Sequence, residues 1–122
     1  MKPQFDTDKP IYLQIAESIE DDILQEIVAE EAQVASTNQM AAMYRINPAT
    51  AAKGLNMLVS EGILYKRRGI GMFVATGAVE KIRLKRKTAF YDKYVIPLLN
   101  EAAHLEISTD EIIEMLNDES ES

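Results

Sequence analysis

The chain has 122 residues, which is enough for one compact domain or for a small domain with a helical appendage. Hydrophobic residues make up 47% and charged residues 27%, a composition typical of folded globular proteins and too apolar for a disordered chain. Cysteine is absent and there is a single histidine, His104, so the sequence excludes a disulfide scaffold and a Cys/His zinc site, and we expect no metal and no other cofactor.

The net charge is −7, which taken alone argues against a nucleic-acid partner, because phosphates repel an acidic protein. The charges are unevenly distributed along the chain. Residues 10–31 hold seven acids and no base, and residues 98–122 hold eight acids and no base. Residues 32–97 hold eleven bases and three acids, a net charge of +8. The sequence therefore has a basic middle segment between two acidic segments.

Several classes of protein are disfavoured by the motifs. No apolar run is long enough to cross a membrane and the N-terminus lacks the apolar core of a signal peptide, so we expect a cytoplasmic protein with no membrane partner. No nucleophile–base pair or phosphate-binding loop is visible, so we expect that the protein is not an enzyme. Asp110, Glu114 and Asp118 recur at four-residue spacing, which is more typical of a solvated helix face than of a metal site.

The first predicted element is an amphipathic helix over residues 11–27. Its apolar positions recur every fourth residue, with acids between them: Ile11, Ile15, Ile19, Ile23 and Ile27. Residues 28–35 show no strong period and are expected to form a connection.

A capping box, formed by Ser36 and Gln39, predicts the start of a short helix over residues 37–44. Met40 and Met43 are expected to face inward. Asn47 and Pro48 then have the residue types typical of an N-cap and a first helical residue.

The third predicted helix starts at Pro48, runs to about Ser60 and ends at Gly62, a typical C-cap residue. Its expected buried residues are Ala51, Leu55, Leu58 and Val59. Two β-prone runs, residues 63–66 and 72–75, follow it. The two glycines of the segment 67–71 between these runs predict a hairpin.

From residue 78 the pattern is helical to about His104, and it opens with the basic run Lys81–Lys87. Pro97 must kink or restart this helix, because it removes a backbone donor and crowds the preceding turn. A second capping box opens at Ser108 and predicts a final short helix. Its expected inward residues are Ile112, Ile113, Met115 and Leu116, and residues 117–122 are expected to fray.

The order of helix, helix, helix and hairpin, with a short turn between the second and third helices, is that of a winged helix-turn-helix. In this layout the third helix enters the major groove and the hairpin contacts the backbone or minor groove. The predicted fold class is mainly α with a small β-hairpin. We expect residues 1–76 to form an N-terminal winged helix-turn-helix DNA-binding domain and residues 77–122 a short helical dimerisation or effector region.

Basic residues fall where a duplex would meet this fold. Arg45 precedes the third helix, Lys53 lies on its solvent side, and Lys66, Arg67 and Arg68 lie at the hairpin. The solvent side of the third helix is small and polar, which allows close approach to base edges. The alternative is that these are ordinary solvated surface residues. The helix-turn-helix layout favours DNA contact.

Four stretches of the chain carry a resemblance to a known family: Pro10-Ile-Tyr-Leu-Gln-Ile15, Asn47-Pro-Ala-Thr50, Leu58-Val-Ser-Glu-Gly-Ile-Leu-Tyr65 and Arg67-Arg-Gly-Ile-Gly-Met-Phe-Val74. Residues 10–75 resemble the DNA-binding domain of the GntR family of bacterial transcription regulators. The C-terminal part, with Tyr94-Val-Ile-Pro-Leu-Leu99, is similar to the YtrA subfamily. The resemblance implies a homodimeric repressor on a palindromic, double-stranded DNA operator, with an ABC transporter operon as a candidate target.

Together, the layout and the resemblance give the candidate DNA-binding residues Ser36, Thr37, Asn38, Arg45, Asn47, Pro48, Ala49, Thr50, Lys53, Lys66, Arg67, Arg68, Gly69 and Gly71. The chain also departs from the family pattern. The family's Pro-Gly-x-x-Leu-Pro-Ser connection is replaced by Glu31-Ala-Gln-Val-Ala-Ser36, Asn38 replaces a frequent arginine, and Ala52 replaces a basic or long polar residue. These departures bear on the operator sequence and on affinity, not on the fold.

The candidate dimerisation residues form an apolar stripe: Phe90, Tyr91, Tyr94, Val95, Leu98 and Leu99. They could instead line an effector pocket, but so short a region is too small to enclose a large cavity and still pack a core. The residues identify no effector. The basic run Lys81–Lys87 is open to three interpretations: a solvated face, a contact with the DNA backbone, or a contact with the acids of a partner subunit.

A second function stays open because of the acidic net charge. A winged helix can dock a protein partner without binding DNA. The basic strip on the recognition side of the predicted domain favours DNA over this alternative.

Overall fold

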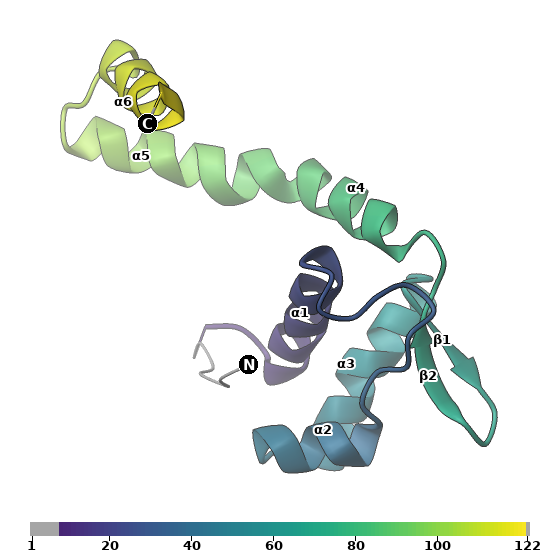
Figure 1. The fold of residues 1–122 in the computed structure, drawn as a ribbon. Coiled ribbons are helices and arrows are strands. Elements are labelled where there is room, and N and C mark those ends of the chain that lie inside the picture. Colours follow the sequence, from purple (N-terminus) through teal and green to yellow (C-terminus); the bar gives the residue numbers. More distant parts are fainter. Residues whose placement is uncertain (1–7, 122) are drawn as a thin grey trace. The chain divides into compact units, whose positions relative to one another are not determined.

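The computed structural model describes residues 8–121. The helical elements in this range are α1 (Ile11–Leu24), α2 (Thr37–Tyr44), α3 (Pro48–Ser60), α4 (Ala78–Phe90), the π-helix η1 (Tyr91–Val95), α5 (Ile96–His104) and α6 (Thr109–Glu121). The strands β1 (Leu64–Arg67) and β2 (Gly71–Val74) lie between α3 and α4 (Figure 1). The predicted fold class, mainly helical with a small antiparallel hairpin in a winged helix-turn-helix order, is confirmed.

The chain divides into two compact units, and the break between them lies within α4, after Leu84. The first turns of α4 belong to the first unit, because Ala78 and Ile82 are fully buried in its core. The functional division expected between residues 76 and 77 stays a prediction. No helix in the described part of the chain is long and apolar enough to cross a membrane.

Helix α1 ends at Leu24, three residues before the predicted end. Glu26 adopts a left-handed backbone with φ of 60°, and the Ile27 amide donates to the Asp22 carbonyl, a bonding pattern that closes a helix. Ile27 is consequently 66% exposed, and Ile11 at the other end of α1 is also exposed. The predicted apolar stripe is therefore correct in its middle, at Ile15, Ile19 and Ile23, and wrong at both ends.

Helix α3 is the centre of the first unit and contacts α1, α2 and β1 (Figure 1). Its apolar face is fully buried at Ala51, Leu55 and Leu58. Its C-terminus is closed at Gly62, as predicted, where the backbone has φ of 75°. Val59 is only partly buried.

Gly54 lets α3 lie directly against α1. A Cβ at this position would be 2.8 Å from the backbone carbonyl oxygen of Tyr12, closer than any side chain allows. The packing of the two helices therefore depends on the absence of a side chain here.

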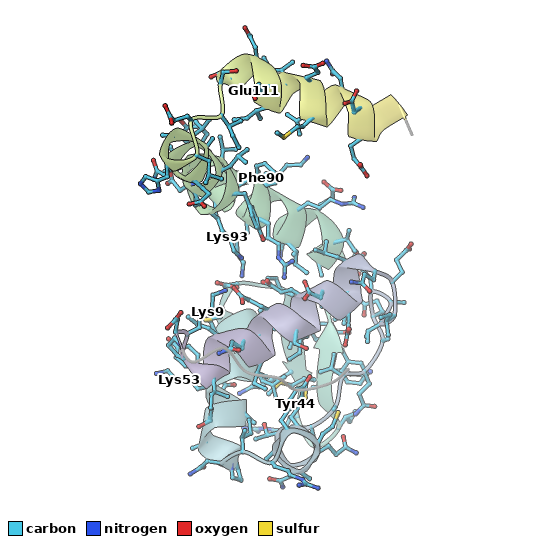
Figure 2. The ribbon with its side chains drawn as sticks, turned by 90° about the vertical axis from the view of Figure 1, so that its left-hand side faces the viewer. Lys9, Tyr44, Lys53, Phe90, Lys93 and Glu111 are labelled. Atoms are coloured by element: carbon cyan, nitrogen blue, oxygen red, sulfur yellow. The ribbon has the colours of Figure 1, made fainter. Side chains whose placement is uncertain are left out.

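The start of α2 is the predicted capping box. The Gln39 amide donates to the Ser36 hydroxyl oxygen at 3.1 Å, and the Ser36 amide donates to the Gln39 side chain at 2.8 Å. Met40 is buried as expected, but Met43 is 54% exposed, so its predicted inward position is wrong. Tyr44 (labelled in Figure 2) is buried instead. Its hydroxyl lies 3.1 Å from the Ser18 hydroxyl on α1.

The hairpin strands pair in register from Leu64 with Val74 to Arg67 with Gly71, one residue later in β1 and one residue earlier in β2 than predicted. The preceding connection also joins this sheet. Backbone hydrogen bonds link Glu31 to Val74 and Val34 to Met72. Residues 31–34 thus form an irregular third edge of the wing, a pairing that the sequence prediction missed.

In the second unit, Pro97 restarts the helix. The preceding segment Tyr91–Val95 is a π-helix, and the Ile96 amide donates to the Tyr91 carbonyl five residues earlier. Pro97 has no amide and its ring crowds the turn before it, so a wider turn at this point relieves the conflict. The predicted interruption is confirmed, and its form is a π-turn.

Helix α6 begins at the predicted second capping box, in which Ser108 and Glu111 exchange hydrogen bonds of 3.0 and 3.1 Å. Ile112 is buried, whereas Ile113, Met115 and Leu116 are 49–62% exposed, so their predicted inward positions are wrong for the single chain. The helix continues to Glu121, where fraying was expected, while Ser122 lies outside the described residues.

We predict that Gly54→Ala destabilises the first unit. Alanine gains about 1 kcal/mol of helix propensity over glycine, but overpacking against a backbone carbonyl costs about 1–3 kcal/mol. Thermal unfolding followed by circular dichroism should show a lower midpoint for Gly54→Ala. Asn56→Ala, a change at an exposed position of α3, should leave the midpoint unchanged or raise it. A midpoint raised in both variants would contradict the close approach.

Candidate nucleic-acid interface

The turn between α2 and α3 sets the start of the candidate recognition helix. Arg45 ends α2 in a left-handed conformation with φ of 55°, and its side chain is exposed. Asn47 then caps α3, because its side-chain oxygen accepts the Ala49 amide at 2.8 Å. Pro48 occupies the first helical position, where a missing amide costs nothing. The predicted cap is confirmed, and it fixes where the exposed face of α3 begins.

The exposed face of α3 forms one side of an open hollow of about 430 Å³, whose lining residues are Ile11, Tyr12, Ala49, Thr50 and Lys53. The Lys53 ammonium lies 4.1 Å from the centre of the Tyr12 ring. This distance is within the range of a cation–π contact, which holds the ammonium near the surface of the hollow. The structure thus brings Ala49, Thr50 and Lys53 together, as the sequence predicted.

The wing presents three exposed bases, Lys66, Arg67 and Arg68. The Arg67 guanidinium lies 5.2 Å from the centre of the Phe73 ring on β2, so its direction is set by an aromatic contact. Gly69, at the tip, has φ of 76° and open space where a side chain would be. The tip is therefore a narrow, cationic turn.

Gly71, one of the candidate DNA-binding residues, lies against the side chain of Gln33. A Cβ on Gly71 would fall 2.5 Å from the side-chain nitrogen of Gln33. That nitrogen donates to the Ile70 carbonyl at 3.1 Å. The space in front of Gly71 is thus taken by Gln33, which ties the hairpin tip to the connection before α2.

At the amino end of α2, Ser36 is engaged in the capping box, Thr37 is partly buried and Asn38 is exposed. Two bases of the run Lys81–Lys87 have partners within the first unit. Arg83 forms an ion pair of 2.7 Å with Glu80, and the Lys81 ammonium donates to the Gly62 carbonyl at 3.1 Å. Part of this run therefore serves local structure.

Two adjacent acids at the base of the wing were missed by the sequence analysis. Glu31 accepts hydrogen bonds from the Tyr65 and Thr76 hydroxyls, both at 2.5 Å. Both bonds lower the pKa of Glu31, and the bond from Thr76 contributes more than the bond from Tyr65. The hydrogen bond to Glu31 in turn raises the pKa of Tyr65. The charge of Arg67 lowers the pKa of Glu31 further.

Glu30 binds a different element. Its carboxylate accepts the amides of Gly77 and Val79 at 2.9 and 3.1 Å, at the start of α4. These two bonds, Gly77 first, lower the pKa of Glu30. For Glu31, the departure of residues 31–36 from the family pattern was the available signal. The partners of both acids lie too far along the chain to be predicted from the sequence.

In the second unit, the candidate dimerisation residues form a largely exposed stripe along α4, η1 and α5. Phe90, Tyr91, Tyr94, Leu98 and Leu99 are 39–57% exposed, and Val95 is partly buried. The Phe90 and Tyr94 ring centres are 5.3 Å apart. An apolar groove of about 170 Å³ between α5 and α6 adjoins the stripe at Leu98.

We predict that the two carboxylates stabilise the fold in a pH-dependent way. Because the pKa of each is lowered in the folded state, the unfolded state takes up protons first as the pH falls. Their stabilisation is therefore present above the ordinary value of 4.5 and is lost below it. Urea unfolding of the wild type and of Glu30→Gln/Glu31→Gln at pH 7, 5 and 3 measures this. The difference between them should shrink at pH 3, and an unchanged difference would contradict the prediction.

Comparison with known proteins shows which family has this arrangement. Residues 11–74 match the model of the gntR family of bacterial regulatory proteins. The HTH-type transcriptional regulator YhcF of Bacillus subtilis is 34% identical over 87 residues, which cover 71% of this chain and 72% of YhcF.

Two solved structures are similar to the chain. One is a transcriptional regulator of the GntR family from Bacteroides thetaiotaomicron, 36% identical, with a TM-score of 0.73 over 91% of this chain and 96% of that one. The other is AraR(DBD) in complex with operator ORX1, 28% identical, with a TM-score of 0.54 over 62% of this chain and 92% of that one. From the family match over the first unit and the likeness to YhcF, we conclude that this chain belongs to the gntR family of bacterial regulatory proteins.

Proposed function

We propose that the protein is a homodimeric, sequence-specific DNA-binding transcriptional repressor of the YtrA-like subfamily. The observation that carries this proposal is the placement of exposed bases on the free face of α3 and on the wing of a winged helix-turn-helix. These are the two elements through which such a fold meets a duplex. AraR(DBD), a relative of the first unit, is bound to operator DNA in its solved structure.

Helix α3 enters the major groove in this proposal. Ala49 is exposed and small, and Thr50 and Lys53 stand beside it, so this face can come close to base edges. The Thr50 hydroxyl can bond a phosphate or a base, and Lys53 can reach a phosphate or a guanine. Arg45, the exposed C-cap of α2, lies just before the Asn47 cap of this helix.

The wing supplies contacts with the DNA backbone. Lys66, Arg67 and Arg68 are exposed on a hairpin whose tip has no side chain at Gly69. Because guanidinium groups bind phosphate through two parallel hydrogen bonds, the two arginines suit this role better than lysines would. These contacts orient the protein on the duplex without reading its sequence.

The second unit supplies the dimer. Soluble monomers seldom expose so many contiguous aromatic and leucine side chains as the stripe from Phe90 to Leu99. The groove between α5 and α6, at about 170 Å³, is smaller than a typical ligand pocket of roughly 300–1,000 Å³, which favours an interface over an effector site. Two-fold symmetry then implies an inverted-repeat operator with half-sites about 10 base pairs apart.

Repression follows if the dimer occupies a promoter and blocks the polymerase. An ABC transporter operon as the target rests on the YtrA-like character of residues 94–99. Sequencing the DNA that the purified protein selects would give the operator and its neighbouring genes. A gel-shift with the protein's own upstream region at low salt is the direct first test. No shift by a folded dimer would favour a protein-docking winged helix instead.

We predict that Arg67→Ala/Arg68→Ala weakens binding to all DNA sequences and flattens its dependence on salt. Each phosphate contact that is lost should reduce the slope of log K against log salt by about 0.9. Lys93→Ala removes a positive charge that lies outside both the wing and the run Lys81–Lys87, and it should change the slope less. Fluorescence anisotropy at several salt concentrations measures both variants. An unchanged affinity and slope in the arginine variant would remove the wing from the interface.

We predict that Tyr94→Glu/Leu98→Glu prevents dimerisation. Both side chains lie in the exposed stripe, and a buried carboxylate without a partner is costly. Light scattering should give the monomer mass for this variant and the dimer mass for the wild type. Asn100→Glu, an added acid at an exposed position of α5, should stay dimeric. A Tyr94→Glu/Leu98→Glu variant that stays dimeric would place the interface elsewhere.

A further inference from the structure

Glu31 has an unfavourable backbone for a glutamate. Its φ is 71°, in the left-handed region that side chains with a Cβ rarely adopt. Its amide donates to the Val74 carbonyl of β2 at 2.7 Å, so this conformation is fixed by the sheet edge. A glycine would fit this backbone more easily, and the presence of a glutamate calls for a reason in its side chain.

The carboxylate of Glu31 joins the two ends of the hairpin. One oxygen accepts the Tyr65 hydroxyl from β1, and the other accepts the Thr76 hydroxyl, two residues beyond β2. Tyr65 and Thr76 are 34 and 45 residues from Glu31 along the chain. The side chain therefore fastens the wing at its base.

From Tyr65 the contacts continue to the arginine of the wing. The Tyr65 ring stacks on Phe73 with ring centres 5.8 Å apart. The Arg67 guanidinium lies 5.2 Å from the centre of the same Phe73 ring. Tyr65 and Arg67 are two residues apart on β1 and so point to the same side of the strand. Glu31, Tyr65, Phe73 and Arg67 thus form one continuous set of side-chain contacts.

We propose that Glu31 is a positioning residue for DNA binding, which holds Tyr65 and through it the aromatic surface on which Arg67 lies. This rests on the proposed function, because Arg67 is taken to contact phosphate. The neighbouring Glu30 binds the amides of Gly77 and Val79, so the same dipeptide also fixes the chain where it leaves the wing for α4.

The charge of Glu31 disfavours DNA binding, whereas its hydrogen bonds favour it. A carboxylate near Arg67 repels an approaching phosphate, so removing the charge alone favours DNA binding. Two variants separate these effects. Glu31→Gln removes the charge, but its amide oxygen still accepts one hydroxyl and its amide nitrogen donates to the other. Glu31→Ala removes the charge and both hydrogen bonds.

The test has two measurements on the full-length chain. Hydrogen exchange of the wing amides, residues 66–72, reports on the wing without DNA, with the α3 amides as an internal reference. Fluorescence anisotropy with the selected operator reports on binding. Tyr65→Phe, which keeps the ring on Phe73 and removes only the hydroxyl, provides a second route to the same loss. Glu26→Ala is the matched control, because Glu26, just after α1, also has a left-handed backbone conformation.

We expect wing amides in Glu31→Ala to exchange at least about tenfold faster than in Glu31→Gln, with α3 unchanged. Operator affinity should be about three- to tenfold lower in Glu31→Ala than in Glu31→Gln, and Tyr65→Phe should shift in the same direction. Equal wing exchange and equal affinity in the two Glu31 variants would overturn the proposal. If the wild type binds no DNA while the wing still loosens in Glu31→Ala, the proposed function fails and the role of Glu31 in holding the wing stands.

Discussion

The close contact between α1 and α3 at Gly54 is the constraint on which the first unit depends. Because Gly54 has no side chain, the Tyr12 carbonyl can occupy the space beside α3. That contact directs the side chains of Ala51, Leu55 and Leu58 toward the core and leaves the opposite side of the helix in solvent. The neighbouring residue, Lys53, then meets the ring of the same tyrosine. One residue of α1 therefore both sets the approach of α3 and holds a cation on its exposed face.

The features that could be predicted from the sequence are those whose signals lie within a few residues. The capping boxes at Ser36 and Ser108, the Asn47 cap and the Gly62 end each depend on three or four consecutive positions, and each is present. The misses have longer-range causes. Helix α2 has eight residues, too few for periodicity to fix its buried face, and the burial of Tyr44 rather than Met43 depends on Ser18, 26 residues away.

The candidate interface follows the same division. Its bases could be identified from their positions in the helix-turn-helix order of elements, because lysines and arginines are normally exposed and their place on the surface follows without knowledge of tertiary contacts. The devices that orient them could not: Tyr12 beneath Lys53, Phe73 beneath Arg67 and Glu31 at the wing base are tertiary contacts. The acidic net charge is also better understood in this light, because two acids of the first acidic segment make structural contacts: Glu31 bonds to the base of the wing and Glu30 to the start of α4.

The π-turn before Pro97 has a consequence for the apolar stripe of the second unit. Phe90, Tyr94, Leu98 and Ala102 are spaced by four residues, and in a regular α-helix each such step rotates the side chain by about 40° around the axis. Three steps would carry the last residue about a third of a turn from the first. A turn that takes an additional residue winds back much of this rotation. The irregularity that accommodates a proline thus also keeps an aromatic half and an aliphatic half of the helix in phase, as one surface.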